Sequence, residues 1–306
     1  MKRTLVAAPA LLTVAALSLA ACSSPSSAGP TPSDSAGPLS VVASTNVWGD
    51  IAATVGGDAV SVTSIIDDPD KDPHEYEADA QNQLSLSKAA VVIENGGGYD
   101  DFVDTMLDAS GNDSAVVINA VDVSGYQASG GEELNEHVWY DFPTVEKVID
   151  QLEDAFAAAD PANASTFSEN ADALKDQLDQ LEQQEADLKS QYAGEGVAIT
   201  EPVPLYMLDA IGLDNKTPEE FSEAIEEDTD VAPDVLQETL ALFSDHAVKL
   251  LAYNEQTTGP QTEAVLDAAQ QNAIAVVPVT ETLPDGDTYV SWMTGNLDAI
   301  ASALAS

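Results

Sequence analysis

The sequence has 306 residues, and its acidic side chains outnumber the basic ones by 54 to nine, which gives a formal net charge of −45 at pH 7. Its one arginine is Arg3. Nucleic acids, phosphates and anionic lipids are recognised by clustered lysine and arginine, so the composition argues against them as partners. It also argues against a receptor for amino acids or oxyanions, because such receptors usually bind their ligand through arginine. An acidic, solvated surface is the simplest explanation of most of this charge, and a cation is the ligand that such a field attracts.

The first 22 residues have the pattern of a secretion signal. Lys2 and Arg3 precede an apolar run over residues 5–21 that is too short for a membrane-spanning helix. The end of this run, Leu-Ala-Ala-Cys at 19–22, resembles a bacterial lipobox, in which cleavage exposes the cysteine and lipid is attached to its sulfur. We therefore predict a signal peptide over 1–21 and lipidation of Cys22; the alternative is an ordinary signal peptide with an incidental cysteine. Cys22 is the single cysteine, so no intramolecular disulfide can form.

Residues 22–38 are mostly serine, proline, glycine, alanine and threonine after the cysteine, and this composition predicts a flexible tether. Beyond it, short β-rich runs alternate with amphipathic helical stretches. We expect strands at 39–43, 60–66, 89–93 and 115–118, and then at 197–200, 249–253 and 273–279. Such alternation predicts βαβ units around a mostly parallel sheet. The fold class is therefore α/β, with two lobes at residues 39–159 and 194–306, each a mostly parallel sheet flanked by helices.

A long helix is predicted between the lobes, over residues 160–193. Asp160 and Pro161 have the pattern of an N-cap followed by proline at the first helical position. Large apolar residues recur every seven positions, at Phe167, Leu174, Leu181 and Leu188, on an otherwise polar helix. The stripe predicts a rod that packs along both lobes of a monomer; the alternative is one strand of a coiled-coil dimer.

Two of the three histidines lie in acidic sequence. His74 occurs in Asp-Pro-His-Glu-Tyr-Glu at 72–77, and His137 in Glu-His-Val-Trp-Tyr-Asp at 136–141. Imidazole nitrogen and carboxylate oxygen are ligands of Zn, Mn and Fe, so both histidines are candidate metal ligands. His74 follows the predicted strand 60–66, on the edge of an open α/β sheet where ligands bind, although an ordinary surface histidine is the alternative. His246 has no acidic cluster beside it, and we interpret it as structural or exposed.

Acidic residues beside His137 allow two interpretations. Asp141 can cap the helix that starts near Phe142, or it can accept a hydrogen bond from the ligating ring and fix its tautomer. The sequence leaves both roles open. Glu132, Glu133 and Glu136 are either a solvated loop or a weak metal-gathering approach to His137.

Two glutamates follow predicted strands of the second half. Glu201 comes directly after the strand 197–200, and Glu281 follows the strand 273–279, each preceded by threonine. A carboxylate at the end of a core strand is costly to bury unless a positive charge pairs with it. Each glutamate taken alone also fits an ordinary loop acid, but the repeated arrangement favours two metal ligands.

These motifs together resemble the metal-binding solute receptors of ABC importers for zinc and manganese. The resemblance covers the body of the chain in order. It is carried by the lipobox, Val-Val-Ala-Ser-Thr at 41–45, the motifs around His74 and His137, the long helix, and Asp-Thr-Tyr-Val-Ser-Trp-Met at 287–293 with Asn296 and Leu297.

The resemblance implies two lobes joined by the long helix, with a metal ion held by His74, His137, Glu201 and Glu281. The third ligand agrees with part of the family, and the fourth departs from it. The third ligand is histidine in many zinc receptors and glutamate in manganese receptors, and here it is Glu201; the fourth is usually aspartate, and here it is Glu281. The histidine-rich loop of some zinc members is absent from the sequence.

The donor set bears on the choice of metal. Two imidazoles and two carboxylates supply up to six donor atoms, which suits Mn²⁺ better than tetrahedral Zn²⁺, although most such sites bind zinc more tightly. We therefore expect a lipid-anchored receptor on the outer face of the cytoplasmic membrane that carries Mn²⁺ or Zn²⁺ to an ABC permease and catalyses nothing. The alternatives are a secreted metallohydrolase that uses the same ligands and an anchored adhesin.

Overall fold

The computed structural model describes residues 37–68, 76, 79–128 and 134–306. The predicted signal peptide, the lipidation site at Cys22, most of the tether, His74, Glu132 and Glu133 lie outside the described residues. Within the described ranges, every helix is too short or too polar to cross a lipid bilayer.

The first lobe is built on a parallel sheet whose strands lie in the order β2-β1-β3-β4. Its strands are β1 (Leu39–Thr45), β2 (Val60–Ile66), β3 (Val91–Glu94) and β4 (Val116–Asn119). All four agree with the predicted strands to within two residues at each end. β3 is buried at every position, as expected for a central strand covered on both faces.

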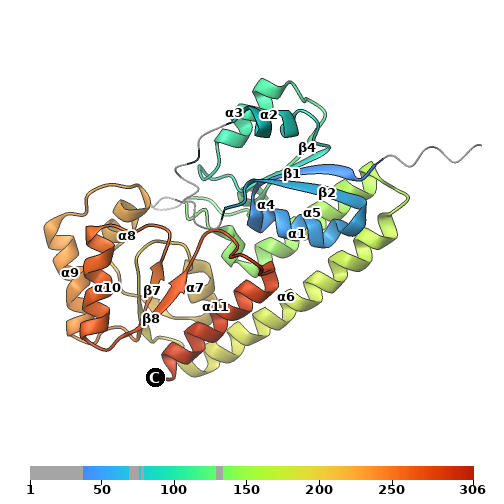
Figure 1. Cartoon of the computed structure of the whole chain (residues 1–306). Coiled ribbons are helices and arrows are strands. Elements are labelled where there is room, and N and C mark those ends of the chain that lie inside the picture. Colours follow the sequence, from blue (N-terminus) through green and yellow to red (C-terminus); the bar gives the residue numbers. More distant parts are fainter. Residues whose placement is uncertain (1–36, 69–75, 77–78, 129–133) are drawn as a thin grey trace, which may run out of the picture. The chain divides into compact units, whose positions relative to one another are not determined.

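Helices cover both faces of this sheet (Figure 1). The helices of the lobe are α1 (Asn46–Gly56), α2 (Ala80–Leu86), α3 (Phe102–Ser110), α4 (Ala120–Ser124) and α5 (Phe142–Ala159), with short 3-10 turns η1 (Gly57–Ala59) and η3 (Val138–Tyr140). Val41 and Ala43 face the core formed with α1 and α5, whereas Val42 and Val92 pack with α2 and α3. The alternation follows from the period of two along a strand.

The second lobe repeats the arrangement with strand order β6-β5-β7-β8, again all parallel. Its elements are β5 (Gly196–Ile199), α7 (Leu205–Ile211), β6 (Asp214–Asn215), α8 (Glu219–Glu226), α9 (Pro233–Ser244), β7 (Leu250–Asn254), α10 (Pro260–Gln271), β8 (Ala275–Val279) and α11 (Tyr289–Leu304). The sequence predicted β5, β7 and β8. It missed β6, because a two-residue edge strand of Asp and Asn has no apolar run.

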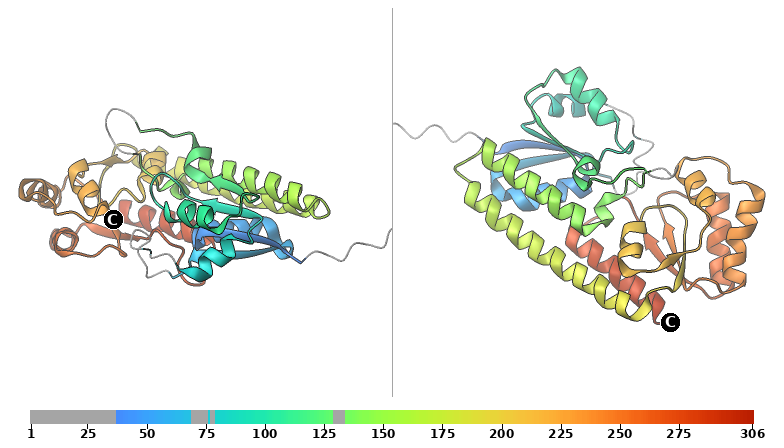
Figure 2. Two further views of the ribbon diagram at one scale, coloured as in Figure 1. Left: turned by 90° about the horizontal axis from the view of Figure 1, so that it is seen from above. Right: turned by 180° about the vertical axis from the view of Figure 1, so that it is seen from behind.

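The connecting helix α6 spans Ala164–Tyr192, so its predicted start at Asp160 is wrong. Asp160 is instead the C-cap of α5, and its carboxylate accepts hydrogen bonds from Ala162 and Asn163 in the turn between the helices. α6 contacts α1 and α5 of the first lobe and α7 and α11 of the second, and Figure 2 shows it running beside α5 and α11. The apolar stripe is buried in these contacts within one chain, which contradicts the coiled-coil alternative.

Candidate metal centre

Three polar side chains meet at the carboxyl ends of adjacent strands in the second sheet. Glu201 follows β5, Asn254 ends β7 and Glu281 follows β8. Their exposed fractions are 3%, 0% and 1%. Parallel strands end at a common edge of a sheet, where ligands of open α/β folds bind. The strand ends therefore bring two carboxylates into one buried region.

Both oxygens of Glu281 accept a hydrogen bond. Asn254 Nδ2 donates to Oε1 at 2.9 Å, and the Tyr99 hydroxyl donates to Oε2 at 3.2 Å. The backbone amide of Glu281 donates to Gln256 Oε1 at 2.5 Å. Tyr99 belongs to the first lobe, so a carboxylate of the second lobe is oriented in part by a residue of the other.

The turn that carries Tyr99 follows β3 and depends on three consecutive glycines. Gly96, Gly97 and Gly98 all have positive φ, a region that other residues adopt at a cost. A Cβ at Gly96 would also lie 2.2 Å from Asn119 Oδ1. Asp100 closes the turn, because its carboxylate accepts from the backbone amides of Asn95 and Gly96 at 2.6 and 2.8 Å.

The tautomer of His137 is fixed by Asn135. The Asn135 side chain donates through Nδ2 to the carbonyl of Pro202 at 3.2 Å, and its Oδ1 accepts from the His137 backbone amide at 3.1 Å. The atom that faces the ring is therefore the acceptor Oδ1, which lies 2.8 Å from His137 Nδ1. Nδ1 must carry the proton in the neutral ring, and the lone pair lies on Nε2. This is the orientation that metal ligation through Nε2 requires.

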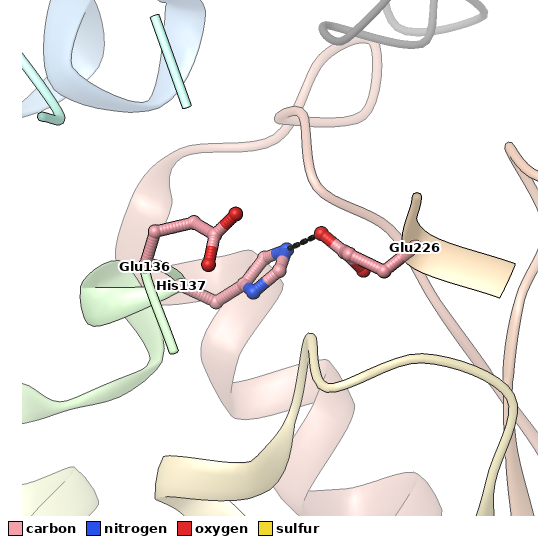
Figure 3. A group of neighbouring side chains, drawn as sticks. All are labelled: Glu136, His137 and Glu226. Carbon is pink, nitrogen blue, oxygen red and sulfur yellow. Dashed lines mark ion pairs between the residues drawn. The ribbon is translucent and has the colours of Figure 1, made fainter. Parts of the chain in front are cut away.

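His137 Nε2 points at carboxylates. The ring is fully buried, and Nε2 has no hydrogen-bond partner among the described residues. Oε1 of Glu226, the last residue of α8, lies 3.4 Å from it, and Glu136 presents its carboxylate beside the same ring (Figure 3). One nitrogen of His137 and one oxygen from each of these glutamates lie within 4.8 Å of one another. Such a group of donors matches the ligands of a divalent metal ion.

Raised pKa values in this region show that several negative charges lie close together. The pKa of Glu201 is raised to about 9, first because the group is buried and then because Glu226 and Glu281 repel its charge; hydrogen bonds from Asn254 and Thr257 oppose the rise. Glu201 Oε2 is buried, with no hydrogen-bond partner among the residues that the structure describes. Burial, followed by the charge of Glu281, also raises the pKa of Tyr99. A divalent cation would remove the repulsion that these shifts measure.

The structure brings three of the four predicted ligands into one network. Glu201 interacts electrostatically with Glu281 and with Glu226, and Glu226 contacts His137. His74, the fourth, lies outside the described residues and stays a prediction.

The capping role of Asp141 is confirmed, because its side chain accepts from the Thr144 amide at the start of α5. Its alternative role as the acceptor from the ligating ring is wrong for His137. Asn135 occupies that position at Nδ1, and the Asp141 carboxylate is engaged by Thr144 and Tyr126.

The sequence analysis missed four residues of the network: Tyr99, Asn135, Glu226 and Asn254. The glycines before Tyr99 and the short spacing of Asn135 from His137 were available signals. Glu226 stands in the acidic run 226–228, where nothing in the sequence distinguishes it from its neighbours.

The model of the family "Zinc-uptake complex component A periplasmic" (ZnuA) matches residues 41–303. The chain belongs to this family. The resemblance drawn from the motifs is thereby confirmed, and so is the fold. The solved structure of TroA, a periplasmic zinc binding protein from Treponema pallidum, superposes with a TM-score of 0.72 at 22% identity, covering 89% of this chain and 100% of that one. FpvC from Pseudomonas aeruginosa, solved in complex with Mn²⁺, gives 0.71 at 19% identity over 88% of this chain and 98% of that one.

Curated relatives of this ZnuA-family chain include manganese-binding lipoproteins. MntA of Bacillus subtilis (strain 168) is 32% identical over 143 residues, which cover 46% of each chain. The match to MntA of Halalkalibacterium halodurans covers 59% of that protein, so the chain matches about half the length of these two relatives. The manganese ABC transporter lipoprotein scaA of Streptococcus gordonii is 25% identical over 311 residues, covering 96% of this chain and 97% of that one.

Proposed function

We propose that this ZnuA-family protein is an extracytoplasmic receptor that binds Mn²⁺ or Zn²⁺ and delivers it to an ABC permease, without catalysing a reaction. The proposal rests on the position of the Nε2 atom of His137. It is buried, its lone pair is fixed by Asn135, and it faces a carboxylate of the other lobe. A polar atom in that position needs a partner, and a divalent cation supplies one while neutralising the surrounding glutamates.

The proposed ligands are His74, His137, Glu201 and Glu281. His74 is included because of its sequence motif and because the chain belongs to this family. Because two of these four ligands are carboxylates, the site should accept a hard cation such as Mn²⁺, although zinc binds more tightly to most sites of this kind. Residues from both lobes meet at Glu281, so metal binding should hold the lobes together.

The proposal includes anchoring through Cys22, which follows an apolar run with a lipobox pattern. Several relatives are named lipoproteins of metal ABC transporters, which supports the same arrangement. The chain would then work as a monomer on the outer face of the cytoplasmic membrane, tethered by residues 22–38, with a membrane permease as its partner and no nucleic-acid partner.

The test is the metal content of the mature protein purified from a medium balanced in Mn, Fe and Zn, repeated with Glu201→His. Wild type should carry about one equivalent of metal. The variant should shift toward zinc, because imidazole suits zinc and a carboxylate suits manganese. Protein that binds neither metal, and whose melting temperature does not rise when Mn²⁺ or Zn²⁺ is added, would contradict the receptor function. An unchanged metal preference in the variant would place Glu201 outside the ligand set.

A further inference from the structure

The carboxylate nearest to the proposed ligand His137 is not among the predicted ligands. Glu226 Oε1 lies 3.4 Å from His137 Nε2, and Figure 3 shows the two side chains pointing at each other from α8 and from the segment before η3. The Glu226 side chain is 12% exposed and the His137 side chain 0%. This contact therefore lies inside the protein, where water screens charges poorly.

The position of Glu226 is electrostatically unfavourable in the metal-free protein. It is the last residue of α8, where the carbonyl groups of the helix end already present partial negative charge. Its charge acts on Glu201 and on Tyr99, so it lies close to the Glu201 carboxylate and to the Tyr99 hydroxyl. Glu226 and Glu136 thus converge on one imidazole nitrogen, and the charge of Glu226 also reaches Glu201 after β5.

The contact also lacks a hydrogen in the neutral state of the ring. With the proton on Nδ1, both His137 Nε2 and an ionised Glu226 oxygen present lone pairs to each other at 3.4 Å. Two lone pairs attract only when a proton or a cation lies between them. Because the surrounding residues are acidic and the orientation of the imidazole is fixed, a metal ion suits this contact better than a proton does.

On this basis, and resting on the metal-binding function proposed above, we propose that Glu226 is an additional metal ligand that biases the site toward Mn²⁺ over Zn²⁺. A third carboxylate raises the number of oxygen donors, which Mn²⁺ accepts in a larger coordination shell and tetrahedral Zn²⁺ does not need. Glu226 would close the site from α8 while the strand ends supply Glu201 and Glu281.

The experiment compares wild type, Glu226→Gln and Glu227→Gln in the mature, metal-free protein. Glu227 is the adjacent residue, carries the same charge and is exposed, so its variant controls for loss of one negative charge. The dissociation constants for Mn²⁺ and Zn²⁺ are measured by competition with a chelator at pH 7.5, and bound Mn²⁺ is followed by electron paramagnetic resonance.

Glu226→Gln should weaken Mn²⁺ binding at least tenfold and Zn²⁺ binding less than threefold, whereas Glu227→Gln should change both by less than threefold. The metal-free Glu226→Gln protein should unfold at an equal or higher temperature than wild type, because one repelling charge is gone. Glu226→Asp, which keeps the charge on a shorter side chain, should give an intermediate Mn²⁺ affinity.

Two results would overturn the assignment. Unchanged affinities in Glu226→Gln would show that Glu226 does not reach the metal. Tighter binding would show that it only pairs with a protonated His137 and competes with the metal. In both cases wild type still binds metal, so the receptor function stands; if wild type binds neither Mn²⁺ nor Zn²⁺, both proposals fail.

Discussion

Two regions of the described structure that bury carboxylates differ in their surroundings. One region is the candidate metal centre, where the pKa of Glu201 is raised to about 9; the other is α6, where Glu185 is 6% exposed and its pKa is raised to about 8. Burial is the largest cause in both. Around Glu185 the other charges are Glu182, Asp141 and Lys189, and no imidazole is among them.

The difference shows what identifies a metal centre. Glu185 lines a cavity of about 260 Å³ beside Tyr140 and Lys189, and its Oε1 has no hydrogen-bond partner in the described structure. It is an acid buried by the packing of a helix. Glu201 instead accepts hydrogen bonds from Asn254 and Thr257, and the neighbouring Glu226 contacts a ring whose tautomer is fixed. A raised pKa marks burial in both regions, and convergence of unlike donors marks the site.

Removing the imidazole should have the largest effect. His137→Ala deletes a nitrogen whose lone pair faces the carboxylates, and we expect the dissociation constants for Mn²⁺ and Zn²⁺ to rise at least 100-fold. Isothermal titration calorimetry on metal-free protein measures this. His246→Ala is the control, since that residue is exposed at the turn after α9. An effect below threefold for His137→Ala would exclude the ring as a ligand.

Metal affinity should depend on pH through Glu201. Its raised pKa of about 9 means that the metal-free group is protonated at neutral pH, so binding a cation must displace a proton. Affinity should therefore increase as pH rises from 6 to 9, with a slope of up to about tenfold per pH unit for each proton released.

The slope of log affinity against pH is the measurement, and calorimetry in buffers of different ionisation enthalpy counts the protons. Glu201→Gln should release about one proton fewer than wild type at pH 7.5. A flat profile from pH 5 to 8 in wild type would contradict both carboxylate and imidazole ligation.

Removing the hydrogen-bond partner of the His137 ring should lower metal affinity less than removing the ring itself. Asn135→Ala removes the acceptor at Nδ1 and the link to Pro202, so the imidazole loses its fixed orientation. Loss of such a partner lowers metal affinity by roughly 10- to 100-fold in other metal sites, and we expect about tenfold here. Asn135→Asp keeps an acceptor at the ring and should retain most of the affinity. Equal affinities for all three proteins would show that Nδ1 needs no acceptor.

The parts that sequence predicts best are those with a periodic signal. The seven strands with apolar runs and the apolar stripe of α6 follow from spacing alone, and Glu201 and Glu281 were found because both follow such strands. The start of α6 was misplaced because Asp160-Pro161 fits the end of one helix as well as the beginning of the next. Glu226 could not be predicted, because only packing of α8 against the second sheet separates it from the exposed Glu227.

The smallest effect is expected in the other buried region, and its sign follows from the pKa of Glu185. This pKa is raised from 4.5 to about 8, so the folded protein holds the proton more tightly than the unfolded chain. Stability should therefore fall as pH rises from about 4.5 to 8 and level off above that range. Glu185→Gln cannot ionise, so its free energy of unfolding should equal that of wild type near pH 4 and exceed it by about 1 kcal/mol at pH 8. In a rigid site the whole shift from 4.5 to about 8 would give more, at roughly 1.4 kcal/mol for each pKa unit.

Urea unfolding of the metal-free proteins at pH 4, 6 and 8 measures this difference, with Glu169→Gln, an exposed position of the same helix, as the control. Metal affinity should be unchanged in Glu185→Gln, because its carboxylate belongs to the packing of α6. A loss of metal binding in this variant, with stability unaffected, would remove the distinction between the two buried regions. For Glu185→Gln we expect a gain in stability and no change in metal affinity. For His137→Ala we expect the reverse, because the deleted ring mainly lowers metal affinity.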